Sequence, residues 1–244
     1  MKRSPLRRIA VVIPAHNEEE AIAACLKAVD KAAHRAASMR YEVSIYVVCD
    51  ACTDRTAEIV RHFGIAPLIV HERNVGAARA SGASAALRWG AQWLAFTDAD
   101  SRVTEDWLAA QLSLESDVVC GTVTVEDWGL YDEDFRSHFA TIYQDIDGHR
   151  HIHGANLGMS ADAYRRAGGF AMLTSSEDVA IVKALEYAGA TIAWSAAPRV
   201  VTSARIDHRA PKGFGATLVA AAERLRRSTA AKQTDITTAH LNFQ

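Results

Sequence analysis

Short apolar runs alternate with longer amphipathic stretches through the first half of the chain. Four runs have the length and composition of buried strands, at residues 9–13, 41–48, 67–70 and 93–97. The stretches between them are helical in pattern and open on capping or acidic residues, at Asn17–Glu20, Thr53–Thr56 and Asn74. This alternation predicts an α/β fold with a mostly parallel central sheet and helices on both faces.

The second half has a less regular pattern. Strands are expected at residues 117–125, 191–194 and 199–202. Helices are expected at residues 132–147, 177–187 and 213–227. Residues 151–160 fit a strand or a loop that leads into a short helix ending at Gly168-Gly169.

Three polar clusters directly follow predicted strands, at residues 15–18, 50–54 and 98–100. In parallel sheets, ligands bind outside the carboxyl ends of the strands. We therefore expect a functional site at this edge of the sheet.

Composition narrows the choice of partners and compartment. The 244 residues carry a formal net charge of -2, which gives no reason to expect nucleic acid or an anionic membrane as partner. The four cysteines have no disulfide-framework spacing, and the apolar run behind the basic start is too short for a signal peptide or a membrane span. We expect a cytoplasmic protein with free thiols and no transmembrane segment.

Asp98-Ala99-Asp100 is the first candidate for chemistry. Two carboxylates just past a buried strand offer the oxygen ligands that Mg²⁺ and Mn²⁺ prefer, and such ions commonly add substrate phosphates to their shell. By itself the motif also fits a turn that caps a helix.

The order of several short segments is more specific than any one of them. They are residues 9–18, 50–56, 74–82, 98–100, 154–156 and 177–178. This series resembles glycosyltransferase family 2, over roughly residues 8–225. The resemblance implies the Rossmann-like GT-A fold and an inverting, divalent-metal-dependent enzyme, with Mn²⁺ or Mg²⁺ as cofactor. Such an enzyme moves a sugar from a nucleotide-diphosphate donor to a hydroxyl acceptor.

The resemblance also implies a domain organisation. Residues 1–227 would form one catalytic domain, with a nucleotide-binding half at 1–115 and a smaller acceptor-side half at 116–227. Residues 228–244 are polar and would form a frayed tail. Family members often act at membranes, so a peripheral position at the inner membrane face is a second expectation for localisation.

The first two loops would hold the nucleotide. Residues Pro14, Ala15, His16 and Glu18 resemble the family's first loop, which contacts the base and ribose. Residues 49–56 resemble its Asp-Asp-Gly-Ser-Thr-Asp-Gly-Thr loop, in which Asp50 would accept a hydrogen bond from the base.

This second loop departs from the family pattern. Cys49 replaces the first Asp of that motif, and Cys52 replaces its Ser. The identity of the base therefore stays open, with a UDP-sugar as the default expectation and a GDP-sugar as the alternative.

The next segments would hold the diphosphate, the metal and the sugar. Arg79 would approach the nucleotide or the aspartate pair, although a surface arginine on a helix fits equally well. Asp98 and Ala99 would lie near the ribose or sugar, and Asp100 would bind the metal.

Later residues would complete the donor site. Asn156 belongs to a Gly-x-Asn element that would lie near the donor sugar. His208 is a candidate third metal ligand, although a lone loop histidine fits a solvated surface as well. Arg205 would hold the pyrophosphate by charge-assisted hydrogen bonds.

Glu177 and Asp178 open a predicted helix. Acids at a helix N-terminus favour the macrodipole, which is the structural explanation. By resemblance, Asp178 would deprotonate the acceptor hydroxyl and Glu177 would orient the sugar or the acceptor.

His149, His151 and His153 would share one face of a strand. This spacing allows a zinc site, but a polar cleft or solvated face is favoured because zinc also needs a supporting shell.

Three rival functions fit parts of the sequence. Cys49-Asp50-Ala51-Cys52 is a Cys-x-x-Cys that could serve a thiol redox protein. A nucleotidyltransferase shares such an α/β core, but the first loop lacks the glycine-rich phosphate loop typical of that class. A non-catalytic module that binds sugar nucleotides is the third alternative.

Overall fold

The computed structural model describes residues 7–205 and 213–241, with side chains described as far as residue 227. These residues form two compact units. Unit 1 contains the described residues up to 126 together with 145–203. Unit 2 contains residues 127–144 and the described residues from 204 onward.

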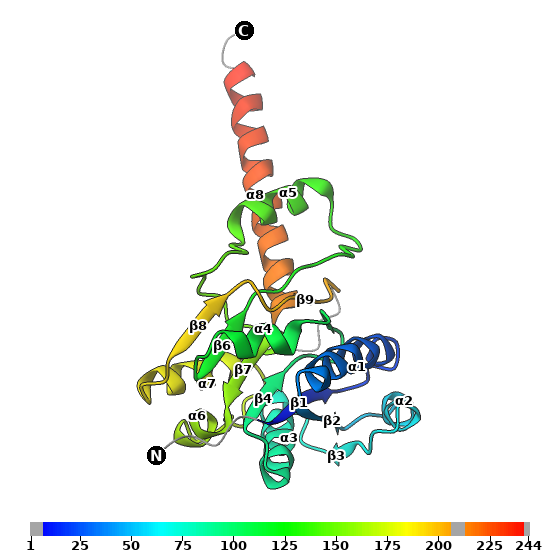
Figure 1. Ribbon diagram of the computed structural model, residues 1–244. Helices are drawn as coiled ribbons and strands as arrows, with labels where there is room; N and C mark the ends of the chain where they lie inside the picture. Colours follow the sequence, from blue (N-terminus) through cyan, green and yellow to red (C-terminus); the bar gives the residue numbers. More distant parts are fainter. Residues whose placement is uncertain (1–6, 206–212, 242–244) are drawn as a thin grey trace. The chain divides into compact units, whose positions relative to one another are not determined.

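Unit 1 is built on a seven-stranded sheet (Figure 1). In spatial order its strands are β3 (Leu68–Val70), β2 (Glu42–Asp50), β1 (Arg8–Ala15), β4 (Trp93–Phe96), β7 (Leu157–Ser160), β6 (Val118–Gly121) and β8 (Ile192–Ser195). Within this sheet β7 is antiparallel to both of its neighbours, and the other pairings are parallel. The predicted mostly parallel α/β fold is confirmed.

A small antiparallel ribbon accompanies the main sheet. It pairs β5 (Arg102–Val103) with β9 (Val200–Val201). The ribbon pairs the segment that follows the Asp98–Asp100 turn with the segment that precedes residue 205.

Helices cover both faces of the sheet in unit 1 (Figure 1). They are α1 (Ile22–Ser38), α2 (Thr56–His62), α3 (Val75–Trp89), α4 (Trp107–Ser113), α6 (Ala161–Arg166) and α7 (Glu177–Tyr187), with a 3-10 turn, η1 (Gly154–Asn156). Helix α1 packs with α2 and α4, whereas α3 and α6 contact α7. Neither α4 nor β5 was predicted from the sequence.

Strand β1, which lies between β2 and β4, shows why the core has two sides. Ala10 and Val12 belong to the core that α3, α6 and α7 cover. Ile9, Val11 and Ile13 alternate with them and are also fully buried. Since successive side chains of a strand point to opposite faces, the continuous apolar run is what a strand buried on both sides requires.

Unit 2 contains two helices. They are α5 (Glu133–Ile142) and α8 (Phe214–Leu241). Helix α5 ends before the expected residue 147, and α8 continues past the expected end at residue 227. Within this unit, aromatic rings pack edge-on or stacked from Trp128 through Phe139 to Phe214. No helix among the described residues is both long and apolar enough to cross a membrane.

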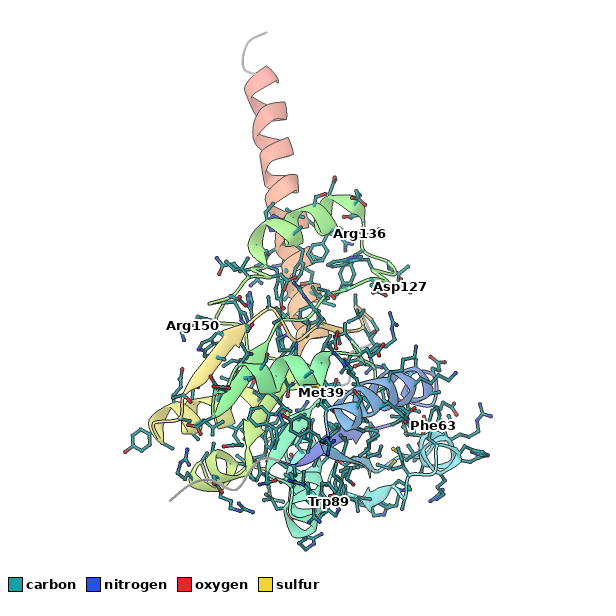
Figure 2. The ribbon with its side chains drawn as sticks, viewed as in Figure 1. Met39, Phe63, Trp89, Asp127, Arg136 and Arg150 are labelled. Atoms are coloured by element: carbon teal, nitrogen blue, oxygen red, sulfur yellow. The ribbon has the colours of Figure 1, made fainter. Side chains whose placement is uncertain are left out.

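Helix α3 runs from the carboxyl edge of the sheet to its amino edge. Trp89 ends the helix (labelled in Figure 2), and Arg8, the first residue of β1, donates from Nη1 to the Trp89 carbonyl oxygen at 3.0 Å. The Arg8 guanidinium also lies 5.3 Å from the centroid of the Trp89 ring. The first turn of α3 therefore lies at the opposite edge, where the carboxyl ends of the parallel strands meet.

Gly82 lets α3 approach the sheet closely. A Cβ atom at this position would lie 2.5 Å from Cγ1 of Val12 and 3.0 Å from Cγ2 of Val48. Both contacts are shorter than packed carbon atoms adopt. The glycine therefore sets the distance between α3 and strands β1 and β2.

Replacing this glycine should destabilise the fold. Gly82→Ala should lower the free energy of unfolding by about 1–3 kcal/mol, the usual cost of overpacking a core. Urea unfolding measures the change. Ser84→Ala, exposed on the same helix, is the matched control and should change stability by less than about 0.5 kcal/mol. Equal stability of Gly82→Ala and wild type would contradict the close approach.

Candidate functional site

Arg79 joins two carboxylates from distant parts of the chain. It lies on α3 and is 2% exposed. Its Nη2 donates to Oδ1 of Asp98, and its Nη1 forms an ion pair with Oε1 of Glu177. The guanidinium carbon lies 6.0 Å from the centroid of the Phe170 ring. The expected alternative of an exposed helix arginine is therefore wrong.

Asp98 faces solvent on one side and Arg79 on the other. Its side chain is 35% exposed, whereas that of Arg79 is 3% exposed. Burial raises the pKa of the Asp98 carboxyl above its usual range, the Arg79 charge opposes this rise, and the negative charge of Asp178 adds to it. The charges of Asp98 and Asp178 therefore repel each other within the site.

Asp178 is held by the backbone of η1. Its Oδ2 accepts a hydrogen bond from the Gly154 amide at 2.9 Å, and its Oδ1 accepts one from the Val179 amide at 2.8 Å. The residue before the acidic pair, Ser176, has a left-handed backbone with φ of 60°. Residues other than glycine rarely adopt this backbone conformation, and at Ser176 it directs the chain into α7.

Gly154 also supports Arg79. A Cβ atom at Gly154 would lie 2.3 Å from Nη2 and 2.6 Å from Cζ of Arg79. The glycine thus contacts the guanidinium with its α-carbon and Asp178 with its amide. Asp98, Arg79, Gly154, Glu177 and Asp178 form one connected group, which we call the acidic cluster.

Asn156 is buried beneath this group and has several hydrogen-bond partners. Its Oδ1 accepts from the Trp107 indole at 2.9 Å, and its Nδ2 donates to the carbonyl oxygens of Thr122 at 2.7 Å and Pro198 at 2.9 Å. These bonds fix η1 to α4 and to two loops. The side chain therefore positions the Gly154 backbone.

Asp50 organises the loop between β3 and α3. Its Oδ1 accepts from the amides of Glu72 at 2.7 Å and Arg73 at 2.9 Å, and its Oδ2 accepts from the amide of Asn74 at 2.7 Å. Asn74 in turn caps α3, because its side chain accepts from the Ala77 amide at 3.0 Å. The buried carboxylate thus fixes the start of the helix that carries Arg79.

The two predicted nucleotide loops are tied to each other. The Glu18 amide donates to Oγ1 of Thr56 at 2.8 Å, and the Thr53 amide donates to Oδ1 of Asn17 at 2.7 Å. Nδ1 of His16 lies 2.6 Å from the Asp50 carbonyl oxygen. Pro14 and Ala15 end β1 beside Val48 and Cys49 of β2. The structure therefore brings both loops together at the carboxyl edge.

Asp100 lies in the turn after β4, with Ala99 buried beside it. The Ser101 amide donates to the Asp98 carbonyl oxygen at 3.1 Å, and the Ser101 hydroxyl lies 2.9 Å from that of Thr202. The carboxylates of Asp98 and Asp100 offer the hard oxygen donors that Mg²⁺ and Mn²⁺ take. This turn therefore fits a divalent cation.

Two predicted site residues are not placed in this group. His208 lies outside the described residues. Arg205 is the last described residue before that gap and belongs to unit 2. Within the described parts of the chain, no three His, Cys, Asp or Glu side chains cluster as a metal-binding group.

The three histidines before η1 stack ring on ring. The ring centroids of His149 and His151 are 5.5 Å apart, and those of His151 and His153 are 5.9 Å apart. Burial, then the charges of the other two rings, lower the pKa of His153 to about 3. Of the two expected surroundings, a polar cleft or a solvated face, the solvated face is wrong for His149, which is buried.

Sequence reasoning missed the residues that support the acidic cluster. Phe170 and Trp107 were not singled out, and neither stands in a chemical motif. The clearest sequence signal for Phe170 was the pair of glycines before it. Gly168 and Gly169 both have positive φ, and the turn that they form precedes the ring that packs against Arg79.

Removing the shared cation should destabilise the protein. Arg79→Ala would leave Glu177 buried without its partner, which should lower the free energy of unfolding by about 3–5 kcal/mol. Urea unfolding tests this value. Arg79→Lys should restore only part of the loss, because an ammonium lacks the fork that bridges two carboxylates.

A double variant provides the control. Adding Glu177→Gln to Arg79→Ala should recover part of the stability, since the uncompensated buried charge is removed. Equal stability of the single and double variants would show that the two side chains do not interact.

Comparison with known proteins identifies the family. The sequence model described as glycosyl transferase family 2 matches residues 10–169. A search of curated protein sequences gives no match. Three solved structures that resemble this chain are 15% to 19% identical to it, so their likeness is evidence for the fold alone.

These three structures are informative. TarS 1–349 from S. aureus, in complex with UDP-GlcNAc, has a TM-score of 0.63 at 16% identity, and the match covers 85% of this chain and 61% of that one. The mannosyltransferase PcManGT from Pyrobaculum calidifontis, with GDP-Man and Mn²⁺, has a TM-score of 0.60 at 19% identity, with coverages of 84% and 59%. GalNAc-T7, with UDP, GalNAc and Mn²⁺, has a TM-score of 0.58 at 15% identity, with coverages of 82% and 44%.

The chain spans less than two thirds of the length of these three proteins. Their likeness to it confirms the GT-A fold expected from the sequence. The family match covers most of the chain and includes the loops at residues 14–18 and 50–56, Arg79, the Asp98–Asp100 turn and η1. This chain therefore belongs to glycosyl transferase family 2.

Proposed function

We propose that the protein is an inverting glycosyltransferase that moves a sugar from a nucleotide-diphosphate donor to a hydroxyl acceptor with the help of a divalent cation. The observation that carries the proposal is the acidic cluster. It joins the carboxylate that follows β4 to the acidic pair that opens α7, through the buried cation Arg79.

The donor would bind along the carboxyl edge of the sheet. The loops at residues 14–18 and 50–56 lie there, tied together by Asn17 and Thr56. UDP-GlcNAc and GDP-Man are the ligands of two structurally similar enzymes. A UDP-sugar is our first choice of donor by resemblance to the family, with a GDP-sugar as the alternative. Asp50 would meet a base N–H with the acceptor capacity that its three backbone hydrogen bonds leave.

The Asp98–Asp100 turn would hold Mn²⁺ or Mg²⁺ together with the diphosphate. When bound, such a cation neutralises the charge that builds up on the departing nucleotide. Asp100 is the protein ligand that we propose, and Asp98 is turned toward Arg79. By resemblance, His208 and Arg205 would add a ligand and a contact to the pyrophosphate.

Asp178 is the proposed general base. Glu177 is 5% exposed at its side chain and is paired with Arg79, so its charge is already compensated. Asp178 is more accessible and is oriented by two backbone amides. It would take the proton of the acceptor hydroxyl as that oxygen attacks the anomeric carbon opposite the nucleotide, which inverts the configuration.

The base assignment predicts a loss of turnover rather than of donor binding. Asp178→Asn keeps the size of the side chain and an oxygen that accepts from the Gly154 amide. It should lower kcat by about 10²–10⁴-fold while the dissociation constant for UDP changes by less than about threefold. Transfer from a panel of nucleotide sugars, or hydrolysis of the preferred donor, provides the rate.

Asp162→Asn is the matched control. Asp162 is also an acid in the first turn of a helix, α6, and is exposed. It should keep the wild-type rate. An Asp178→Asn rate above about a tenth of wild type would reject a base at this position. Normal UDP binding with no transfer by wild type to any acceptor would favour the non-catalytic module.

The metal assignment predicts that EDTA abolishes transfer and that Mn²⁺ or Mg²⁺ restores it. Titration of Mn²⁺, followed by its electron paramagnetic resonance signal in the presence of UDP, measures binding independently of activity. Asp100→Asn should weaken this binding at least tenfold, since one charged ligand is lost. The exposed Asp106, paired with Arg35, supplies the control variant Asp106→Asn. Full activity in EDTA would contradict the metal role.

A further inference from the structure

Two cysteines meet where the first two loops touch. Cys49 is the penultimate residue of β2 and is 1% exposed, and it lies beside Ala15 of β1 in the sheet register. Ala51 follows with φ of 49°, a left-handed conformation that turns the chain sharply. This turn brings the half-buried Cys52 back to the end of β2, where its sulfur contacts the backbone of Ala15, the residue that pairs with Cys49 in the sheet.

The Cys52 sulfur also contacts the other loop. Its thiol donates to the Ala15 carbonyl oxygen at 3.3 Å, and the sulfur accepts from the Asn17 amide at 3.5 Å. These contacts join the loop of residues 50–56 to the loop of residues 14–18. The sulfur is therefore part of the connection between the loops that we assign to the nucleotide.

The surroundings of the two thiols differ. The hydrogen bond from Cys49 lowers the pKa of Cys52 to about 7, burial opposes this effect, and the Asn17 amide adds to it. The same hydrogen bond, together with burial, raises the pKa of Cys49 far above its ordinary value. Near neutral pH, Cys52 is thus present both as a thiol that donates to Ala15 and as a reactive thiolate.

We propose that Cys52 is a site of reversible thiol modification, at which a small disulfide such as oxidised glutathione converts Cys49 and Cys52 into a disulfide that loosens the first nucleotide loop. The consequence for the donor rests on the function proposed above. The thiol chemistry and the change in the loop do not.

The reaction proceeds by two exchange steps. The Cys52 thiolate attacks one sulfur of oxidised glutathione, the glutathione disulfide bond breaks, and one glutathione leaves as its thiolate. Cys49 then loses its proton to water and attacks the Cys52 sulfur, and the second glutathione leaves. The two protein thiols are oxidised by two electrons, and one glutathione disulfide is reduced to two thiols.

The first step prepares the second. While Cys52 is a thiolate, it stabilises the protonated form of Cys49 by accepting a hydrogen bond from it. Once Cys52 carries glutathione, that negative charge is gone and the largest cause of the raised Cys49 pKa is removed, while burial continues to raise it. Cys49 is then free to act as the resolving thiol.

Oxidation would change the contact with the first loop. A disulfide sulfur has no hydrogen to donate, so the bond from Cys52 to the Ala15 carbonyl oxygen is lost. The two sulfur atoms must also close to about 2.05 Å, which draws Cys52 away from Asn17 and toward the buried Cys49. The segment from Pro14 to Glu18 thereby loses ties to its neighbour.

Mass spectrometry of the intact protein tests the chemistry. In oxidised glutathione, wild type should lose two hydrogens, with the disulfide located in the peptide that contains both residues. Cys49→Ala should instead accumulate glutathione on Cys52, because no resolving thiol remains. Cys120→Ala, which removes a buried core cysteine, is the matched control and should behave as wild type. Unmodified Cys49 and Cys52 in folded wild type would overturn the proposal.

Two further measurements test the effect of the disulfide. Amide hydrogen exchange of the peptide containing residues 14–18 should become faster on oxidation and return when dithiothreitol is added. The dissociation constant for UDP should rise about fivefold, the factor that one neutral hydrogen bond contributes. A disulfide that forms without faster exchange at residues 14–18 would overturn the proposed loosening. If reduced protein does not bind UDP at all, the proposed function fails, while mass and exchange still decide this proposal.

The pH dependence of alkylation provides an independent prediction. Since thiolates are the reactive species, the rate at which iodoacetamide modifies Cys52 should reach half its maximum near pH about 7. In Cys49→Ala the midpoint should move upward, toward the ordinary thiol value of about 8.5. The same midpoint in both proteins would show that Cys49 does not stabilise the Cys52 thiolate.

Discussion

The site depends on one buried guanidinium that is shared by two carboxylates. Arg79 reaches Asp98 at the end of β4 and Glu177 at the start of α7, so it fixes the two halves of the sheet edge against each other. The position of Arg79 is itself set upstream. Asp50 holds the loop whose last residue, Asn74, caps α3, and the buried face of α3 is pressed against the sheet at a glycine.

This arrangement is costly and has a specific electrostatic result. Buried ion pairs gain little net stability, because desolvation offsets much of the attraction. Here the acids outnumber the single cation, and the raised pKa of Asp98 reflects burial together with the charge of Asp178. An excess of negative charge at the open side of such a group favours a bound cation, and it disfavours an unshielded diphosphate. Under the proposed function, the ion and the donor would therefore bind most strongly together.

The sequence alone predicted the mostly parallel sheet and the edge of it at which the candidate site lies. Uninterrupted apolar runs such as residues 9–13 report a strand buried on both faces, and Asp98 and Asp100 follow the next such strand. The contacts of Asp50 were not predictable. In the sequence, an aspartate whose carboxylate accepts from three loop amides cannot be told from one whose carboxylate binds a ligand. Asn156 is a similar case, since hydrogen bonds across 49 and 42 residues leave no local pattern. The short elements α4 and β5 are stabilised by tertiary contacts, and neither is long enough to show a hydrophobic periodicity in the sequence.

The reversed strand β7 has a consequence for how such a protein can diversify. Val118 to Cys120 of β6 pair antiparallel with Leu157 to Met159 of β7, so the chain leaves β6 and enters β7 at the same edge. The whole excursion between them begins and ends beside the acidic cluster. Gly154 and Asn156, at the end of this segment, support the acidic cluster and must be kept. Under the proposed function, insertions earlier in the segment could therefore accommodate new acceptors without shifting the pairing of β6 with β7.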